Sequence, residues 1–210
     1  MRPLSPFSPS RGCRGFSLVE LLVVMGLVAI LAAASSVALR SLMSSNGLNQ
    51  GSELIQDLLT RSRRVAISHA HIVEIRFFQC KDPANPKSTA RWRGVQAVEI
   101  LEDGTEQPVN SPTILPHGLI LSGSATASPL LAEELGFAGV SPTHFATVDG
   151  FRRFRFLPNG LTDLSAIDPA KTQWFVTLFS ENDLAKGDPP PNYIVLQVEP
   201  FTGTVTVSQP

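Results

Sequence analysis

The first strong pattern in the chain is an apolar stretch with a single charge in it. Between residues 16 and 39 the side chains after Phe16 are Leu, Val, Ala, Ile, Met and small residues, and Glu20 is the only charged one. A helix rises about 1.5 Å per residue, so this stretch is long enough to cross a hydrocarbon core of about 30 Å. We therefore predict a membrane-spanning helix over residues 16–39.

From residue 40 to residue 70 the apolar positions recur every three, four or seven residues, as on one face of an amphipathic helix. Gly47 and Gly51 each weaken such a helix by about 1 kcal/mol relative to alanine, so we expect either a bend or a loose stretch there. Arg61, Arg63 and Arg64 lie off the apolar stripe, and we interpret them as a solvated face rather than a nucleic-acid patch. The stripe consists of Leu42, Leu48, Ile55, Leu58, Leu59, Ser62 and Ala66.

After residue 70 the period changes from helical to alternating, which is typical of strands. Val73, Ile75 and Phe77 alternate with polar neighbours, as in a half-buried strand. The predicted elements are strands over residues 71–77, 94–101, 114–121, 154–157, 174–179, 193–198 and 204–207, a loop over 81–91, and a short helix over 130–135.

These patterns divide the chain into four parts. A basic leader covers residues 1–15, the membrane or filament-core helix 16–39, its amphipathic continuation 40–70, and a β-rich head 71–210. The predicted fold class is therefore α+β, with a long N-terminal hydrophobic helix packed on a C-terminal antiparallel β-sheet head.

The distribution of charge predicts the orientation of the chain in the membrane and argues against nucleic acid as a partner. Arg11 and Arg14 precede the apolar stretch closely, and only Arg40 follows it closely. The positive-inside rule then leaves the N-terminus in the cytoplasm and the head outside. The net charge of −1 becomes more acidic once the leader is removed, because the leader carries three arginines and no acid. No binding to nucleic acid is expected from this balance.

Three interpretations compete for residues 16–39: a plain anchor, an ordinary signal peptide cut near Ala34, and a prepilin. Glu20 distinguishes them, because a carboxylate in hydrocarbon costs on the order of 2.5–3.5 kcal/mol at a helix centre. An anchor or a signal peptide gains nothing from it. Cleavage after Gly15 would free the amine of Phe16, four residues before Glu20 and on the same helix face. The carboxylate can then neutralise that amine, on its own subunit or on the next one.

The run Arg14-Gly15-Phe16-Ser17-Leu18-Val19-Glu20 resembles the processing motif of the type IV prepilin and pseudopilin family. The resemblance implies a peptidase that cuts after Gly15 and N-methylates Phe16, and a role for Glu20 in assembly. It also implies the partners: the prepilin peptidase/methyltransferase, other pilins or pseudopilins, an inner-membrane assembly platform, and membrane lipid before assembly. The implied location is the bacterial inner membrane, single-pass with the head periplasmic, and then a pilus or pseudopilus.

The order of elements is similar to one branch of that family, the GspH/FimT-type minor pseudopilins and pilins. The similarity rests on a helix ending near Ile67, a following strand, the segment Phe154-x-Phe156-x-Pro158-x-Gly160, and a C-terminal hairpin. The leader and residues 73–78 are also similar to a narrower group, the prepilin-like Verru_Chthon cassette protein D. The resemblance implies a structural subunit of a type IV pilus or a type II secretion pseudopilus, not an enzyme.

The sequence of the head contains no set of residues with the spacing of a known catalytic motif. None of its histidines has a metal-ligand spacing, so no metal or other cofactor is expected. The acids of residues 181–188 lie in one loop, but their spacing does not match an EF-hand, and a solvated turn is the better interpretation. Cys80 is expected to be a small, half-buried strand residue, and Cys13 to be an incidental residue of the leader. The histidines are His69, His71, His117 and His144, and the acids are Glu181, Asp183 and Asp188.

Two other functions stay open at this stage. One is a DNA-binding minor pilin used in DNA uptake, against which the tail from residue 202 to residue 210 counts, because it holds no Lys or Arg. The other is a secreted protein with an ordinary signal peptide, which Glu20 disfavours.

Overall fold

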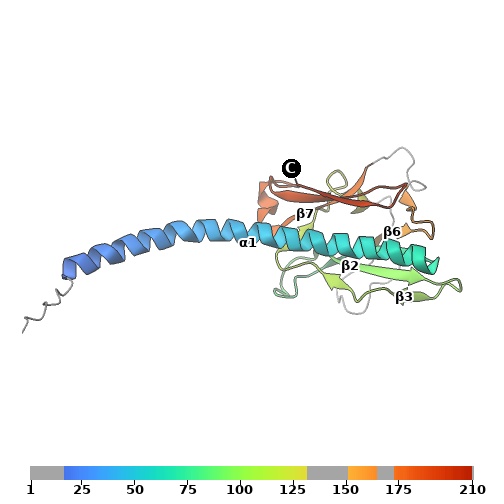
Figure 1. Cartoon of the computed structure of the whole chain (residues 1–210), viewed down its shortest axis with the longest axis horizontal. Coiled ribbons are helices and arrows are strands. Elements are labelled where there is room, and N and C mark those ends of the chain that lie inside the picture. The colour runs from blue at the N-terminus through green and yellow to red at the C-terminus, as the bar shows by residue number, and fades with distance from the viewer. Residues whose placement is uncertain (1–16, 132–150, 165–172, 210) are drawn as a thin grey trace, which may run out of the picture. The chain divides into compact units, whose positions relative to one another are not determined.

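The computed structural model describes residues 17–131, 151–164 and 173–209, without the side chains of residues 33–45. The chain divides into two compact units, Met1–Met43 and Ser44–Pro210. One helix, α1 (Leu18–His69), begins in the first unit and ends in the second (Figure 1). Helix α1 lies within the helix predicted over residues 16–70, and residue 16 lies outside the described residues.

In the first unit the structure describes residues 17–43, which are Ser17 and the N-terminal part of α1. Each described side chain from residue 17 to residue 32 is exposed, and all of the large ones except Glu20 are apolar. Among the residues that the structure describes, no helix combines the length and the apolar character needed to cross a membrane.

In the second unit the rest of α1 packs against the head through the predicted stripe. Leu48, Ile55, Leu59 and Ala66 are almost completely buried, and Ser62 joins them by donating its hydroxyl to Leu58 O at 2.6 Å. A helix whose apolar side chains recur at this spacing buries one continuous face, and that burial is its main source of stability.

Two antiparallel sheets form the head, and Figure 1 shows the C-terminal part of α1 running beside both. In the five-stranded sheet the order is β3-β2-β1-β6, with β4 also pairing with β2. In the four-stranded sheet it is β5-β7-β8-β9. The strands are β1 (Ile72–Cys80), β2 (Arg91–Ile100), β3 (Glu106–Pro108), β4 (Thr113–Ile114), β5 (Leu119–Leu121), β6 (Phe151–Phe156), β7 (Trp174–Ser180), β8 (Tyr193–Val198) and β9 (Val205–Ser208).

The α+β fold class, with an N-terminal helix and an antiparallel head, is confirmed. Several details of the prediction are wrong. The single strand expected over residues 114–121 is two strands, β4 and β5, which belong to different sheets. Strand β2 begins at Arg91, inside the predicted loop, and the three-residue strand β3 was not predicted. Of the helix predicted over residues 130–135, the structure describes only Leu130 and Leu131, which belong to a 3-10 turn, Pro129–Leu131.

Helix α1 continues through both Gly47 and Gly51 without interruption. Gly51 is buried, and a β-carbon there would lie 2.6 Å from Leu119 Cδ1 and 3.1 Å from Leu178 Cδ2. Gly47 has nothing within 4 Å of that position. Gly51 therefore lets the helix approach the four-stranded sheet closely, which is a packing role rather than a hinge.

Candidate functional site

The N-terminal motif is the first candidate site, and Glu20 is the member of it that the structure describes. Glu20 lies in the first turn of α1 with an exposed side chain. Gly15 and Phe16 lie outside the described residues, and so does Cys13. A carboxylate in the first turn interacts favourably with the positive end of the helix dipole.

Ser17 defines where the helix begins, a role that was not among the predictions from the sequence. Its hydroxyl oxygen accepts a hydrogen bond from the Glu20 backbone N–H at 3.1 Å, and its carbonyl accepts one from Leu21 N–H at 3.1 Å. Serine with glutamate three residues later is the capping-box pattern, so the signal was present in the sequence. Glu20 therefore lies in the first turn of the helix, and its side chain is exposed.

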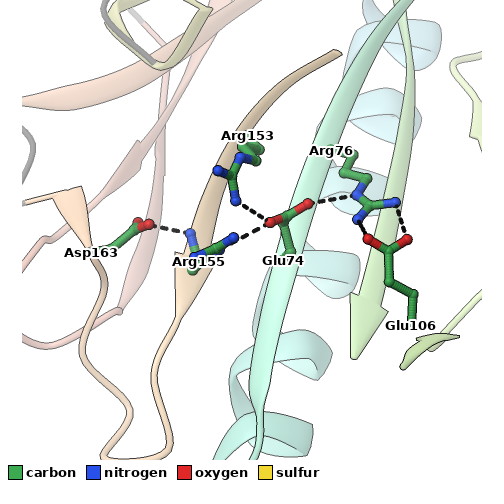
Figure 2. Close-up of polar contacts among 6 residues, drawn as sticks. All are labelled: Glu74, Arg76, Glu106, Arg153, Arg155 and Asp163. Atoms are coloured by element: carbon green, nitrogen blue, oxygen red, sulfur yellow. Dashed lines mark hydrogen bonds and ion pairs between the residues drawn. The ribbon is translucent and has the colours of Figure 1, made fainter. Parts of the chain in front are cut away.

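A second candidate is a buried ion cluster on the five-stranded sheet, centred on Glu74 of β1 (Figure 2). Glu74 is 2% exposed. Its carboxylate accepts from Arg76 Nε at 2.7 Å, from Arg155 Nε at 2.9 Å and from Arg153 Nη1. Arg76 also donates two hydrogen bonds to Glu106 on β3, so the cluster joins β3, β1 and β6. The alternation of residues 71–77 predicts a half-buried strand with Glu74 and Arg76 on its polar side, whereas both side chains are buried.

The cluster fixes the charge of its central acid. Burial by itself raises the pKa of the Glu74 carboxyl, but the hydrogen bonds from Arg76, Arg153 and Arg155 and the charge of Arg76 outweigh it and hold that pKa below its ordinary value. Because each of these arginines already has a carboxylate partner, the group is suited to joining strands rather than to binding a ligand.

The loop acids and the histidines are also engaged with neighbours. Arg93 of β2 is 1% exposed and pairs with Glu181 at 3.0 Å and with Asp82 at 3.3 Å. The remaining acids of the predicted loop have partners as well: Asp183 pairs with Lys186, and Asp188 accepts from Ser122. That segment is mostly a 3-10 helix, Glu181–Lys186, rather than a plain loop. In the described part of the chain no group of His, Cys, Asp and Glu could hold a metal ion.

Two of the four histidines lie against the carboxylate of Glu99. His69 Nδ1 and His71 Nδ1 lie 2.9 and 2.7 Å from its Oε1, at the junction where α1 ends and β1 begins. Burial raises the pKa of the Glu99 carboxyl, and the hydrogen bonds and charges of His71 and His69 lower it to a net value below the ordinary one. His117 pairs with Asp82 in the same way. His144 lies outside the described residues.

Two expectations about single side chains are corrected. Arg63 is half-buried rather than solvated, because its Nε donates to Gly160 O at 3.1 Å and so connects α1 to the turn after β6. Cys80 is fully buried rather than half-buried, and burial raises the pKa of its thiol to about 11. In the described part of the head these polar contacts join neighbouring elements of the fold, and Glu20 of the N-terminal motif has an exposed side chain.

The N-terminal residues carry a recognisable motif. Residues 10–36 match the family described as the prokaryotic N-terminal methylation motif. This is a prepilin-type N-terminus. The match includes Gly15, Phe16, Ser17 and Glu20, so the capped helix start and the exposed carboxylate both belong to the prepilin-type N-terminus.

Solved structures resemble the chain in fold. One is the minor pseudopilin EpsH from the type II secretion system of Vibrio cholerae, with 12% identity and a TM-score of 0.42, over 78% of this chain and 97% of that one. Another is the type IV minor pilin FimU of Pseudomonas aeruginosa, with 12% identity and a TM-score of 0.43, over 79% of this chain and 94% of that one. No curated protein matches the sequence.

Proposed function

We propose that the chain is a pilin-like structural subunit, cut after Gly15, methylated on Phe16, and assembled through its N-terminal helix into a pilus or pseudopilus. The observation that carries this proposal is the match of residues 10–36 to the N-terminal methylation motif. A prepilin peptidase that also methylates the new terminus is the partner that such a motif requires.

Glu20 has its role after cleavage. The cut turns the backbone nitrogen of Phe16 into a cationic amine, and the carboxylate of Glu20 lies four residues further on. Pairing the two charges, within one subunit or between neighbours, removes most of the cost of carrying either into an apolar environment. The exposed side chain of Glu20 is compatible with both arrangements.

The proposed location in a membrane rests on the apolar N-terminal segment. Residues 16–39 contain one charged side chain and follow two arginines closely, which supports a single-pass anchor in the bacterial inner membrane with the N-terminus cytoplasmic and the head outside. Before assembly the exposed apolar side chains contact lipid. In the filament they contact the helices of neighbouring subunits, and Gly26, with no atom within 4 Å of a β-carbon position, leaves room for close approach.

The head gives the subunit its position among the others. Its five-stranded sheet is joined by the Glu74 cluster, and its two sheets share one apolar core. We propose that it contacts other pilins or pseudopilins and the assembly platform, as a GspH-like minor subunit, and that it needs no cofactor.

Mass spectrometry of the chain expressed with a prepilin peptidase tests the proposal. We expect a mature N-terminus at N-methyl-Phe16. Replacing Gly15 with a bulky residue should leave the full-length chain, whereas Gly15→Ala is the matched mild change and should be cut slowly. A mature chain that begins at Ser35 indicates an ordinary signal peptidase and overturns the proposal.

A further inference from the structure

A polar cavity lies in the head where β1 ends and β2 begins, beside strands β5 and β7. Its volume is about 250 Å³, and its wall also includes residues of the 3-10 helix Glu181–Lys186 and of the segment that follows β5. Sites for drug-sized ligands measure roughly 300–1,000 Å³, so this cavity suits a smaller group, of the size of one side chain.

Three side chains that can donate hydrogen bonds line this cavity without an acceptor. Arg91 is half-buried, and its Nε is buried with no hydrogen-bond partner in the described structure. No described residue accepts a hydrogen bond from the indole of Trp92 or from the side-chain amide of Gln79 either. Burying part of a guanidinium without a partner is costly, and an anion in the cavity would remove that cost.

Gly123 leaves the N–H edge of Trp92 uncovered. A β-carbon at residue 123 would lie 3.5 Å from both Cδ1 and Nε1 of the Trp92 indole, and both residues line the cavity. Trp92 is only 7% exposed and belongs to the main apolar core, so its ring is held in place. The indole N–H is therefore a fixed donor in the wall, next in sequence to Arg91.

The charges in the wall favour a ligand with a single negative charge. Of the described residues that line the cavity, Arg91 is the only cation and Asp188 the only anion, and Asp188 accepts a hydrogen bond from the Ser122 hydroxyl. The carboxylate of Asp188 would repel a dianion such as phosphate, whereas a carboxylate matches the planar donors of a guanidinium. The rest of the wall is largely apolar and suits a methylene stem: Ile120, Leu121, Phe179 and Leu184.

We propose that this cavity binds the carboxylate of an acidic side chain, glutamate or aspartate, from a neighbouring pilin-like subunit, which rests on the filament assembly proposed above. The carboxylate accepts hydrogen bonds from the Arg91 guanidinium and the Trp92 indole, and its methylene stem lies on the apolar wall. Arginine and tryptophan are among the residues that most often dominate the binding energy of protein interfaces, and here they are adjacent in one cavity.

A first test uses residues 44–210, because every described residue of the main core lies at or after Leu48. The chain has two tryptophans, so the indole N–H of Trp92 gives one of two signals in a ¹⁵N-labelled sample, assigned with Trp92→Phe. The probe 4-methylpentanoate should shift this signal saturably, with a dissociation constant of roughly 1–10 mM. The uncharged 4-methylpentanamide and inorganic phosphate should both bind at least ~10-fold more weakly. Equal binding of the amide overturns the proposal.

Variants of the two charged wall residues separate binding from folding. Arg91→Gln should weaken binding of 4-methylpentanoate at least ~10-fold and leave the urea midpoint of the head unchanged or higher, because Arg91 has no partner to lose. Lys87→Gln is the matched control, since it removes the same charge from an exposed side chain outside the cavity and should bind normally. Asp188→Asn keeps an acceptor for Ser122 and should tighten binding. Binding that occurs only in Asp188→Asn would mean that Asp188 neutralises Arg91, which overturns the proposal.

The full chain, expressed with a prepilin peptidase and assembly partners, tests whether the carboxylate belongs to a subunit. Arg91→Glu should leave cleavage after Gly15 intact and lower co-purification with filaments at least ~10-fold, whereas Lys87→Glu should co-purify normally. Normal cleavage with normal incorporation of Arg91→Glu overturns this inference and leaves the proposed function standing, and the cavity then takes a free carboxylate if the head binds 4-methylpentanoate. A mature chain that begins at Ser35 overturns the proposed function itself.

Discussion

Gly51 of helix α1 lies so close to Leu119 of strand β5 that a β-carbon at position 51 would be 2.6 Å from Leu119 Cδ1. Leu119 is 4% exposed and Leu178, the second neighbour, is fully buried, so neither can move aside freely. The absence of a side chain at this point sets the distance between the helix and the four-stranded sheet.

Replacing this glycine should therefore destabilise the head. Alanine raises helix propensity by about 1 kcal/mol, but overpacking a filled core costs about 1–3 kcal/mol, so Gly51→Ala should lower the free energy of unfolding of residues 44–210. Gly47→Ala is the control, because nothing lies within 4 Å of its β-carbon position, and it should raise that free energy by up to about 1 kcal/mol. Urea unfolding measures both. Equal gains in the two variants would show that Gly51 has no packing role.

Glu20 should matter only after the leader is removed. Glu20→Val should leave membrane insertion and cleavage after Gly15 intact, because the carboxylate is costly in an apolar segment and the cut lies beyond Phe16. N-methylation and incorporation into filaments should fail, and Glu20→Asp should be a partial defect because its side chain is shorter. Ser17 caps the backbone of residue 20, so the helix start survives the change. Normal recovery of Glu20→Val in purified filaments would refute the charge-pairing mechanism.

The Glu74 cluster should make a large and pH-dependent contribution to stability. Glu74→Gln leaves Arg76, Arg153 and Arg155 without their shared carboxylate. Breaking a buried pair costs ~3–5 kcal/mol, and the lower end applies because Arg153 and Arg155 are about a third exposed. Glu106→Gln, at a side chain that is 54% exposed, should cost about 1 kcal/mol or less.

The sign of the pH dependence follows from the lowered pKa of Glu74. A group whose folded pKa lies below its unfolded one contributes stability above the unfolded pKa, and that stability is lost as the pH falls through the folded value. The Glu74→Gln variant should therefore lose less stability than the unchanged head between pH 7 and pH 3 in urea titrations. Parallel curves for the two proteins would mean that Glu74 is not held ionised by its arginines.

The thiol of Cys80 should be inert in the folded head. It is buried, its pKa is raised to about 11, and only the thiolate is a good nucleophile. An aromatic disulfide reagent at pH 8 should report no thiol in native residues 44–210 and one thiol per chain in urea. Rapid reaction of the native head would contradict the burial of this side chain. A Ser208→Cys variant should react at once under the same native conditions.

Local signals in the sequence predict the N-terminal site. The match to the N-terminal methylation motif covers the contiguous residues 10–36, and the chemistry expected of Gly15, Phe16 and Glu20 depends on their order along the chain. The helix, the strands β7 and β8, and the buried stripe from Leu48 to Ala66 were predictable for a related reason. Their periods of 3.6 and 2 residues are properties of neighbouring positions.

Tertiary structure decided the features that depend on distant segments. Residues 114–121 contain two strands because β4 finds its partner in β2 and β5 finds its partner in β7, which no local period encodes. Glu74 and Arg76 look like solvent-facing strand residues, and they are buried because Glu106, Arg153 and Arg155 arrive from other strands to pair with them. Gly51 looks like a weak point in a helix, and only the approach of Leu119 and Leu178 makes it a packing position. In each case the residue that determines the outcome is distant in the sequence. The residues next to a side chain along the chain therefore do not indicate what that side chain will contact in the folded protein.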